Sequence, residues 1–349
     1  MVKIKFDLEK GIIDFLQKNP NSSSNEIFNE LQDFVAYATV KRNLKLVLDK
    51  NYISKTGIGK ATKYSINDSY DVLRTINLEN YFESEIDERQ INTAFNFELI
   101  KKTLNTISLF NKDEILYLDS LHQKFIKNSS TLSQNEYKME FERLAIDLSW
   151  KSSQIEGNTY SLLETELLLK EQKTASGKTK DEATMLLNHK KTLDFILENQ
   201  DYINPLQVSR IEDIHRLLIS DLGIDKNIRN RRVGISGTNY KPLDNEFQIK
   251  EALEDLCNLV NKQNNIFEKA LLTLVLLSYI QAFSDGNKRT ARIVSNAILI
   301  YNKHCPLSFR TVESIEYKKA MLLFYEQNNI SAFKKIFMEQ YEFAVNTYF

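Results

Sequence analysis

The sequence contains few of the residues that interrupt helices or cross-link chains. Its 349 residues include 9 glycines, 4 prolines and 2 cysteines. So few helix-breaking residues favour a mainly helical fold. With only Cys257 and Cys305, the sequence indicates neither a disulfide framework nor a cysteine metal site, which fits a reducing compartment. The chain is long enough for two or three domains and a substantial core.

An excess of one charge and a long apolar segment are also absent. Lys and Arg number 46 against 47 Asp and Glu, so no overall field directs the protein to nucleic acid or membranes. The most apolar stretch, residues 270–283, is shorter than the roughly 20 residues that cross a bilayer and predicts a buried helix. The first residues, MVKIKFDLEK, lack the apolar centre of a signal peptide. We therefore expect a soluble, cytoplasmic protein with no membrane partner.

Residues 1–70 predict a small winged helix-turn-helix domain. Apolar residues recur at helical spacing within 7–20, 22–32 and 37–51. The pattern then changes, and residues 51–66 indicate two short strands around a glycine-containing turn. Three helices followed by a hairpin are the elements of a winged helix, in their order along the chain.

The third helix and the hairpin of this domain are rich in basic residues. From Val40 to Tyr64 there is one acidic residue, Asp49, and the basic residues are Lys41, Arg42, Lys45, Lys50, Lys55, Lys60 and Lys63. Phosphate contact needs such a stripe, so DNA is one predicted partner. We expect its contacts to be Lys41, Arg42, Lys45, Lys60 and Lys63. The other interpretation is a dimerisation or protein-binding surface on which the lysines are only solvated.

Beyond residue 70 we expect an acidic, partly structured connector at 71–92 and a helical body at 93–349. One segment of the body, NRRVGISGTNYKPL at 230–243, departs from the helical pattern. It predicts a short β-hairpin formed by residues that include Val233, Gly234, Ile235 and Tyr240. The edge of such a hairpin can offer backbone groups to an extended peptide. The alternative is a plain connecting loop.

The segment YIQAFSDGNKRTARI, residues 279–293, combines several features of an anion site. Small polar residues end one helix, and a new helix then begins with free N–H groups and the positive end of its dipole. Gly286 lets a phosphate approach the backbone, and Arg289 and Arg292 share one helix face. Asp285 suits a divalent metal shared with phosphates. We predict a nucleotide-phosphate site, with a structural turn and solvated arginines as the alternative.

A second segment places a carboxylate where a helix ends. Within residues 152–168, Glu156 stands in the last turn of one helix and Gly157 stops it, while Ser161 and Glu164 predict a capping box for the next helix. The dipole disfavours a carboxylate at a helix C-terminus. Glu156 therefore predicts a cationic partner, for which an arginine of the phosphate site is the obvious candidate. The alternative is an exposed glutamate at a frayed end.

These segments resemble the Fic (Fido) family over most of residues 93–349. The family's loop, His-Pro-Phe-x-Asp/Glu-Gly-Asn-Gly-Arg-x-x-Arg, matches residues 281–292, and its inhibitory motif, Ser/Thr-x-x-x-Glu-Gly/Asn, matches Ser152 through Gly157. Its target-docking flap resembles the expected hairpin at 233–242. The resemblance implies an all-helical Fic core with a β-hairpin flap, a preceding winged helix, and an inhibitory helix at about 140–157.

Members of this family usually bind ATP with Mg²⁺ and transfer AMP to a hydroxyl side chain of another protein. The resemblance implies a nucleotide site made of Asp285, Gly286, Asn287, Lys288, Arg289 and Arg292. In it Asp285 would hold Mg²⁺, Gly286 and Asn287 the α-phosphate, and the two arginines the outer phosphates. It also implies a protein partner with a Ser, Thr or Tyr hydroxyl, and homodimers are frequent in the family.

The resemblance also implies a brake on activity. Glu156 would pair with Arg292 and exclude a productive γ-phosphate. In addition, Gln281 stands where the family has the histidine that accepts the hydroxyl proton. An amide cannot act as that base, and losing general-base catalysis typically costs a factor of roughly 10²–10⁴. Gln281 can still orient the hydroxyl.

Lys288 replaces the glycine of AMP-transferring members. A lysine there looks like the death-on-curing toxin branch, which transfers the γ-phosphate, whereas Gly286 and Arg292 look like the AMP-transferring branch. Three interpretations follow. The chain is a self-inhibited AMP transferase weakened by Gln281, a kinase-like phosphotransferase, or a nucleotide-binding pseudoenzyme that regulates DNA or a partner through the winged helix.

Overall fold

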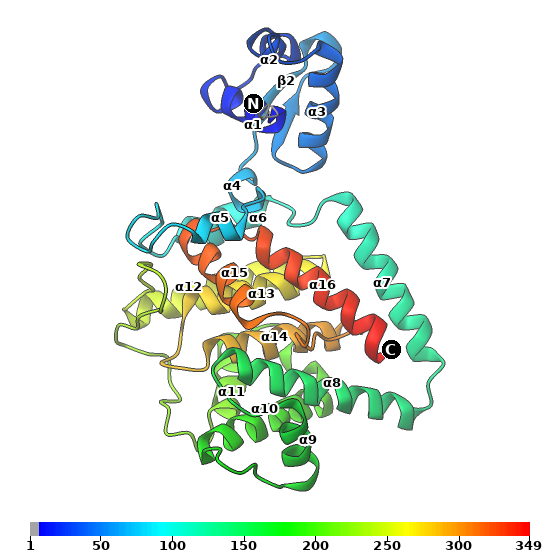
Figure 1. Cartoon of the computed structure of the whole chain (residues 1–349), viewed down its shortest axis with the longest axis vertical. Helices are drawn as coiled ribbons and strands as arrows, with labels where there is room; N and C mark the ends of the chain where they lie inside the picture. The colour runs from blue at the N-terminus through cyan, green and yellow to red at the C-terminus, as the bar shows by residue number, and fades with distance from the viewer. Residues whose placement is uncertain (1–6) are drawn as a thin grey trace, which may run out of the picture. The chain divides into compact units, whose positions relative to one another are not determined.

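The computed structural model describes residues 7–349 and divides into two compact units. The first unit is Met1–Arg74 with Ile107–Ile115, and the second is Thr75–Thr106 with Leu116–Phe349. Both consist mainly of helices, and the described residues contain one two-stranded sheet (Figure 1). The mainly helical fold predicted from the scarcity of glycine and proline is therefore confirmed.

The first unit contains the predicted order of three helices and a hairpin. Its elements are α1 (Leu8–Lys18), α2 (Ser24–Leu31), α3 (Tyr37–Asp49), β1 (Ile53–Thr56), η1 (Gly59–Ala61), β2 (Lys63–Ile66) and α4 (Tyr70–Leu73). The strands pair antiparallel, with Ile53 opposite Ile66. Ser23 and Glu26 form a capping box that starts α2. The unit continues through α4 beyond residue 70, and residues 1–6 of the predicted domain lie outside the described part.

The second unit consists of helices around a buried central pair. Its elements are α5 (Leu78–Phe82), η2 (Leu99–Thr103), α6 (Leu104–Thr106), α7 (Lys112–Ser130, which begins in the first unit), α8 (Gln134–Ile155), α9 (Leu162–Glu171), α10 (Lys180–Glu198), η3 (Gln200–Ile203), α11 (Val208–Leu218), α12 (Glu246–Lys262), α13 (Ile266–Ile280), α14 (Asn287–Tyr301), α15 (Ser314–Gln327) and α16 (Ser331–Tyr348). Every residue from Ala270 to Ile280 is buried.

The central pair is α13 and α14, which pack against each other. The Ser295 hydroxyl donates a hydrogen bond to the Ala270 carbonyl across this contact, at 2.8 Å. The apolar run predicted as a buried helix at 270–283 forms part of α13 as far as Ile280, so that prediction is confirmed for residues 270–280. Within residues 7–349, none of the helices has the length and apolar content needed to cross a bilayer.

The β-hairpin expected at 233–242 is wrong. In the described residues the only strand ladder is that of the first unit, and Lys241 instead forms an isolated parallel bridge with Ala94. Its N–H donates to the Thr93 carbonyl at 2.9 Å. Tyr240 is buried and stacks on tyrosine rings of α13 and α15. Residues 240 and 241 are therefore held by distant parts of the chain. A two-stranded hairpin, which is marginal by itself, does not form at 233–242.

Candidate functional site

The turn between α13 and α14 is set by two residues with positive φ. Gln281 has φ 52° and ends α13, and Gly286 has φ 81° and precedes α14. A Cβ on Gly286 would lie 3.2 Å from the Ile219 side chain and 3.4 Å from the ring of His215, so this position requires glycine for both its φ and its surroundings. The expectation that the first helix continues through Phe283 is wrong, because the chain turns at Gln281.

Asn287 closes this turn, which we call the loop (residues 281–287). Its Oδ1 accepts a hydrogen bond from the Phe283 N–H at 2.8 Å, and its Nδ2 donates to the Phe283 carbonyl at 2.7 Å. The same Nδ2 donates to Oε1 of Gln281 at 3.2 Å. From α11, the ring of His215 stacks on Phe283 at 3.6 Å and its Nε2 bonds the Asp285 carbonyl at 2.9 Å. The loop is therefore held in one shape before any ligand binds.

Gln281 is buried, and its side-chain amide is fully engaged. Besides accepting from Asn287, it donates from Nε2 to the Ser278 carbonyl at 2.7 Å and to the Tyr325 hydroxyl at 3.2 Å. Burial raises the pKa of Tyr325 far above its usual value, so this phenol stays protonated near neutral pH. Burial likewise lowers the pKa of His215 to about 4, which leaves its ring neutral.

The two arginines of α14 are buried but differ in their partners. Arg292 donates from Nε to the Ser152 hydroxyl at 2.8 Å and from Nη2 to the Ser152 carbonyl and to Glu156, both at 2.9 Å. Arg289 donates from Nη2 to Asp285 at 3.1 Å, and the Asp285 side chain is 61% exposed. Its Nε and Nη1 are buried and have no hydrogen-bond partner among the described residues. Nη1 of Arg292 is likewise buried and unpartnered among these residues, so Arg289 has two unsatisfied donors and Arg292 has one.

Glu156, the C-cap residue of α8, joins two cations of the loop region. Its Oε1 lies 2.9 Å from Arg292 and its Oε2 3.2 Å from Lys288. Burial alone would raise the pKa of Glu156, but the charges of Arg292 and Lys288 outweigh it and hold the pKa below its usual value. The capping box of Ser161 and Glu164 that starts α9 is present, as the sequence predicts.

A phosphate group fits the residues around the loop better than a metal ion alone does. The N–H groups at the N-terminus of α14 provide donors for an anion, and the buried guanidinium of Arg289 places positive charge in the same first turn. Among residues 7–349 there is no group of three or more His, Cys, Asp or Glu that could hold a metal. Mg²⁺ is commonly held by one or two carboxylates together with substrate phosphates. Asp285 therefore fits a metal only when a nucleotide supplies the remaining ligands.

Sequence reasoning missed several residues around the loop. His189 of α10 is fully buried, with both ring nitrogens unpartnered among the described residues. Burial first, and then the charges of Arg292 and Arg289, place its pKa well below the usual value. His215 and Tyr325 likewise lie far from the loop in the sequence. No local pattern signals any of these three residues, because only the packed fold brings His215 and Tyr325 to the loop and His189 near the arginines of α14.

The predicted DNA contacts are not equivalent in the first unit. Lys41 and Lys45 line a groove of about 710 Å³ between α3 and the sheet, together with Lys55 of β1. Arg42 and Lys60 are exposed but do not line it. Lys63 of β2 is the remaining predicted contact, and it forms an ion pair with Glu26 at 2.9 Å.

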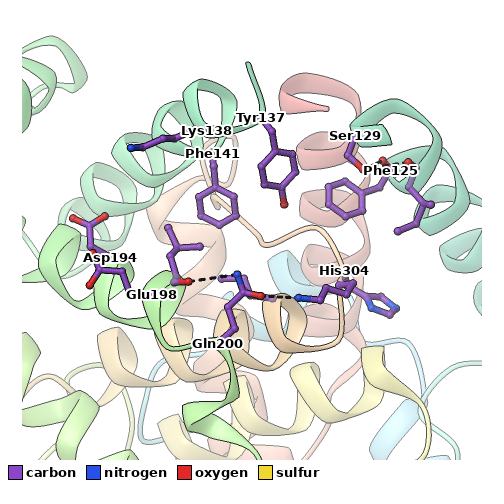
Figure 2. Close-up of a pocket in the computed structure, with 13 residues that line it drawn as sticks. Phe125, Ser129, Tyr137, Lys138, Phe141, Asp194, Glu198, Gln200 and His304 are labelled. Carbon is purple, nitrogen blue, oxygen red and sulfur yellow. Dashed lines mark hydrogen bonds between the residues drawn. The ribbon is translucent and has the colours of Figure 1, made fainter. Parts of the chain in front are cut away.

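A separate cavity of about 720 Å³ lies in the second unit, between α7, α8 and the ends of α10 and α14. Figure 2 shows the rings of Phe125, Tyr137 and Phe141 along one side and Gln200 with His304 along the other. The Gln200 side chain accepts a hydrogen bond from Lys303 at 2.7 Å. The cavity contains none of the residues predicted for nucleotide binding, and its rim carries charges of both signs.

Comparison with known proteins identifies the fold of the second unit. Residues 205–299, which include the loop, match the Fic/DOC family. The structure resembles Fic-1 (residues 134–508) from Caenorhabditis elegans, with a TM-score of 0.59, 20% identity, and coverage of 68% of this chain and 72% of that one. It also resembles a Fic domain containing signaling protein from Bacteroides thetaiotaomicron, with a TM-score of 0.55, 20% identity, and coverage of 66% and 94%. Residues 205–299 are therefore similar to the Fic/DOC family, and the chain shares the fold of these two structures.

Curated relatives carry a more specific name. "Protein adenylyltransferase fic-1" of C. elegans is 25% identical over 170 residues, which are 47% of this chain and 33% of that protein. "Protein adenylyltransferase Fic" of Nematostella vectensis is 29% identical over 179 residues, which are 48% of this chain and 40% of that protein. The chain thus spans well under half the length of these relatives.

Proposed function

We propose that this chain binds ATP with Mg²⁺, transfers AMP to a Ser, Thr or Tyr hydroxyl of another protein, and is held inactive by Glu156. The names of the curated relatives support the reaction class. The observation that carries the proposal is Arg289, whose Nε and Nη1 are buried without a partner in the described part of the chain. Leaving such donors unsatisfied is costly, and an anion with several acceptor oxygens satisfies them.

In this proposal, different residues of the loop region bind different parts of the nucleotide. The N–H groups at the start of α14, with Gly286 and Asn287, bind the α-phosphate, and Arg289 binds an outer phosphate. Asp285 leaves Arg289 and holds Mg²⁺, which neutralises charge on the phosphates. The exposure of the Asp285 side chain makes this exchange of partners feasible without opening the core.

Glu156 restrains the other two cations. While Arg292 donates to Glu156 and Lys288 pairs with it, neither is free to bind a γ-phosphate. The Glu156 carboxylate sits where a phosphate oxygen would compete for the same donors. Removing this carboxylate leaves Arg292 with its two bonds to Ser152, so the guanidinium stays in place and gains a vacant donor. An inhibitory role for Glu156, Ser152 and Gly157 follows from this arrangement.

Transfer by the natural chain is slow in this proposal because of Gln281. The target hydroxyl must lose its proton, and the Gln281 amide has no basic nitrogen to accept it. Its bonds to Asn287, Ser278 and Tyr325 leave it as an orienting group. Positioning and charge stabilisation carry most of phosphoryl-transfer catalysis, so activity is reduced rather than abolished.

The experiment that tests this function uses the Glu156→Gly protein with Mg²⁺ and either α-labelled or γ-labelled ATP. We expect label on protein from α-labelled ATP only. Label from γ-labelled ATP only would instead identify the phosphotransferase alternative, which Lys288 favours. If neither label transfers while calorimetry still detects ATP binding, the chain is a nucleotide-binding pseudoenzyme.

Two controls separate the inhibition by Glu156 from nucleotide binding by Arg289. The natural protein, with Glu156 in place, should transfer less label than Glu156→Gly. The double variant Glu156→Gly/Arg289→Ala should bind ATP more weakly than Glu156→Gly alone, because it lacks the donors with no protein partner. Equal ATP binding by these two variants would contradict the role given to Arg289.

As a second function, we propose that the first unit contacts nucleic acid. The groove lined by Lys41, Lys45 and Lys55 between α3 and the sheet favours this partner. Duplex DNA binding, followed by anisotropy over a salt series, tests the proposal. Lys45→Glu should weaken binding and lower the salt slope by about 1. Lys10→Glu makes the same charge change outside the groove and should have less effect. Formation of a homodimer remains a prediction.

A further inference from the structure

The cavity between α7, α8 and the ends of α10 and α14 has two different walls. One wall carries three aromatic rings, from Phe125 of α7 and from Tyr137 and Phe141 of α8 (Figure 2). The opposite wall contains Gln200 and His304. Its volume of about 720 Å³ lies within the range of roughly 300–1,000 Å³ that is typical of small-molecule sites. The cavity therefore has the size and the apolar lining of a ligand site, and it contains no residue of the proposed nucleotide site.

One hydroxyl group in this cavity lacks a protein partner. The side chain of Tyr137 makes no hydrogen bond with any of residues 7–349, and Figure 2 shows its hydroxyl group pointing into the space between the two walls. Burial raises the pKa of Tyr137, so the phenol stays protonated and can donate. A ligand that carries a hydrogen-bonding group on an apolar ring would satisfy this hydroxyl.

The charged residues around the cavity balance one another. The lining includes two acidic residues, Asp194 and Glu198, and two lysines, Lys138 and Lys303. Burial lowers the pKa of His304 to about 4, so its ring is neutral near neutral pH. Moving an ion from water into such an aromatic cavity is costly when no excess of the opposite charge receives it. The cavity therefore suits a neutral ligand better than a charged one.

The cavity and the contact of Glu156 lie at opposite ends of the same two helices. Phe141 stands in the first half of α8 and Ile300 in the last turn of α14, whereas Glu156 ends α8 and pairs with Arg292 near the start of α14. Phe141 and Glu156 are about 22 Å apart along α8, at 1.5 Å per residue. Because α8 is one uninterrupted helix that packs against α10 and α14, a tilt that withdraws Glu156 also moves Phe141. A ligand that fills the cavity would oppose this tilt.

We propose that the cavity binds a neutral phenolic compound and that the bound compound holds α8 in the position in which Glu156 pairs with Arg292. The ring of the compound packs against the three aromatic side chains, and its hydroxyl group bonds to that of Tyr137. A ligand shifts a protein toward the arrangement that it binds better, which here is the one with the cavity open and Glu156 engaged. Only the inhibitory consequence rests on the proposed function, and the binding site does not.

Calorimetry with three small phenols tests the class of ligand. p-Cresol is neutral, whereas tyramine adds an ammonium group and 4-hydroxyphenylacetate adds a carboxylate to the same ring. We expect p-cresol to bind the full chain most tightly. Tighter binding of tyramine would overturn the proposal in favour of a cation attracted by Asp194 and Glu198. Tighter binding of 4-hydroxyphenylacetate would overturn it in favour of an anion, and so would the absence of any binding of p-cresol.

Two variants test the position of the ligand. Tyr137→Phe removes only the hydroxyl group and should weaken p-cresol binding about fivefold, as expected for one hydrogen bond. Tyr117→Phe makes the same change on α7 outside the cavity and should have no effect. Ile126→Trp fills the cavity from a side chain that is partly exposed and should abolish binding, whereas Leu116→Trp, exposed and outside the cavity, should not. Equal binding by Tyr137→Phe, Ile126→Trp and the natural protein would overturn the proposal.

Hydrogen exchange without nucleotide tests the effect on α8. At about ten times its dissociation constant, p-cresol should slow exchange over residues 150–156 several-fold, up to the limit of about tenfold that linkage sets. Exchange within α13 shows that each variant is folded, and Tyr137→Phe still tests the site if Ile126→Trp does not fold. Unchanged exchange over residues 150–156 with p-cresol bound would overturn the proposal. ATP binding without p-cresol, measured by calorimetry, tests the proposed function separately, so the two failures are distinguishable.

Discussion

The loop and residues 233–241, which we call the flap, are two irregular segments of the second unit, and they are held in different ways. Some bonds of the loop are local and join Asn287 to Phe283, four residues away, and to Gln281, six residues away. Others reach Arg229 and His215, 52 and 70 residues away. The bonds that hold the flap join it to Arg89 and Asp87, which are 148 and 152 residues away in the sequence. The loop therefore combines local and distant bonds, whereas the flap depends mainly on distant ones.

This difference teaches where each segment is sensitive to change. A local structure fails when one of its own residues is replaced, whereas a tertiary one fails when a distant partner is removed. In the proposed function the loop binds the nucleotide, and a role of the flap in docking the target stays a prediction. Substitutions can therefore be chosen that act on one part and leave the other intact.

The largest effect is expected from restoring a base within the loop. In the Glu156→Gly background, Gln281→His should raise the rate of AMP transfer by roughly 10²–10⁴, because an imidazole accepts the hydroxyl proton that an amide cannot. ATP affinity, measured by calorimetry, should change little. Transfer that stays equally slow in the histidine variant would contradict the assignment of position 281 as the missing base.

Breaking the local bonds of the loop should have the next largest effect. Asn287→Ala leaves the Phe283 N–H and carbonyl and the Gln281 amide without this partner, and we expect a loss of about 3 kcal/mol in the free energy of unfolding. ATP binding should weaken as well. Asn302→Ala, at the other end of α14, removes one part-exposed bond and should cost less than about 1 kcal/mol. Denaturant unfolding measures both. Equal losses would mean that the loop is not held by Asn287.

The third effect depends on pH and concerns the ion pairs of Glu156 beside the loop. Because the folded pKa of Glu156 is depressed, its pairing with Arg292 and Lys288 stabilises the protein fully above the unfolded pKa of about 4.3 and is lost as pH falls through the lower folded value. Glu156→Gln should therefore destabilise the protein by about 2 kcal/mol at neutral pH. Thermal unfolding at several pH values should show this difference shrinking in acid. A difference independent of pH would exclude the ionised pair as its source.

The comparison of loop and flap also explains which parts could be predicted from sequence. Much of the loop region could be predicted because its features are contiguous: Gly286 supplies the positive φ, and Asp285, Asn287 and the two arginines lie within residues 285–292. The cationic partner expected for Glu156 is present, since Arg292 and Lys288 both lie beside it. The inhibitory role of that contact stays a prediction.

The parts that sequence could not predict depend on contacts between distant residues. The alternation of Val233 and Ile235 indicated a hairpin, but Lys241 pairs with residues 93–94, and no local pattern signals that choice. In the same way, α13 ends at Ile280 because Gln281 is held by Tyr325 and other residues of the packed core. The connector was expected to be partly structured, and only the fold reveals its contacts with Gly237 and Asn239.

The smallest effect is expected inside the flap. Tyr240 donates a long hydrogen bond of 3.4 Å to the Tyr279 carbonyl, and its ring stacks at 5.2 Å on Tyr279 and 5.6 Å on Tyr325. Tyr240→Phe keeps the stacked ring and removes only this weak bond, so it should cost no more than about 1 kcal/mol. Tyr240→Leu, which also removes the aromatic stacking, should cost more. If the two variants are equally destabilised in denaturant unfolding, the hydroxyl rather than the ring holds this part of the flap. The flap would then depend on one polar contact in the way that the loop depends on Asn287.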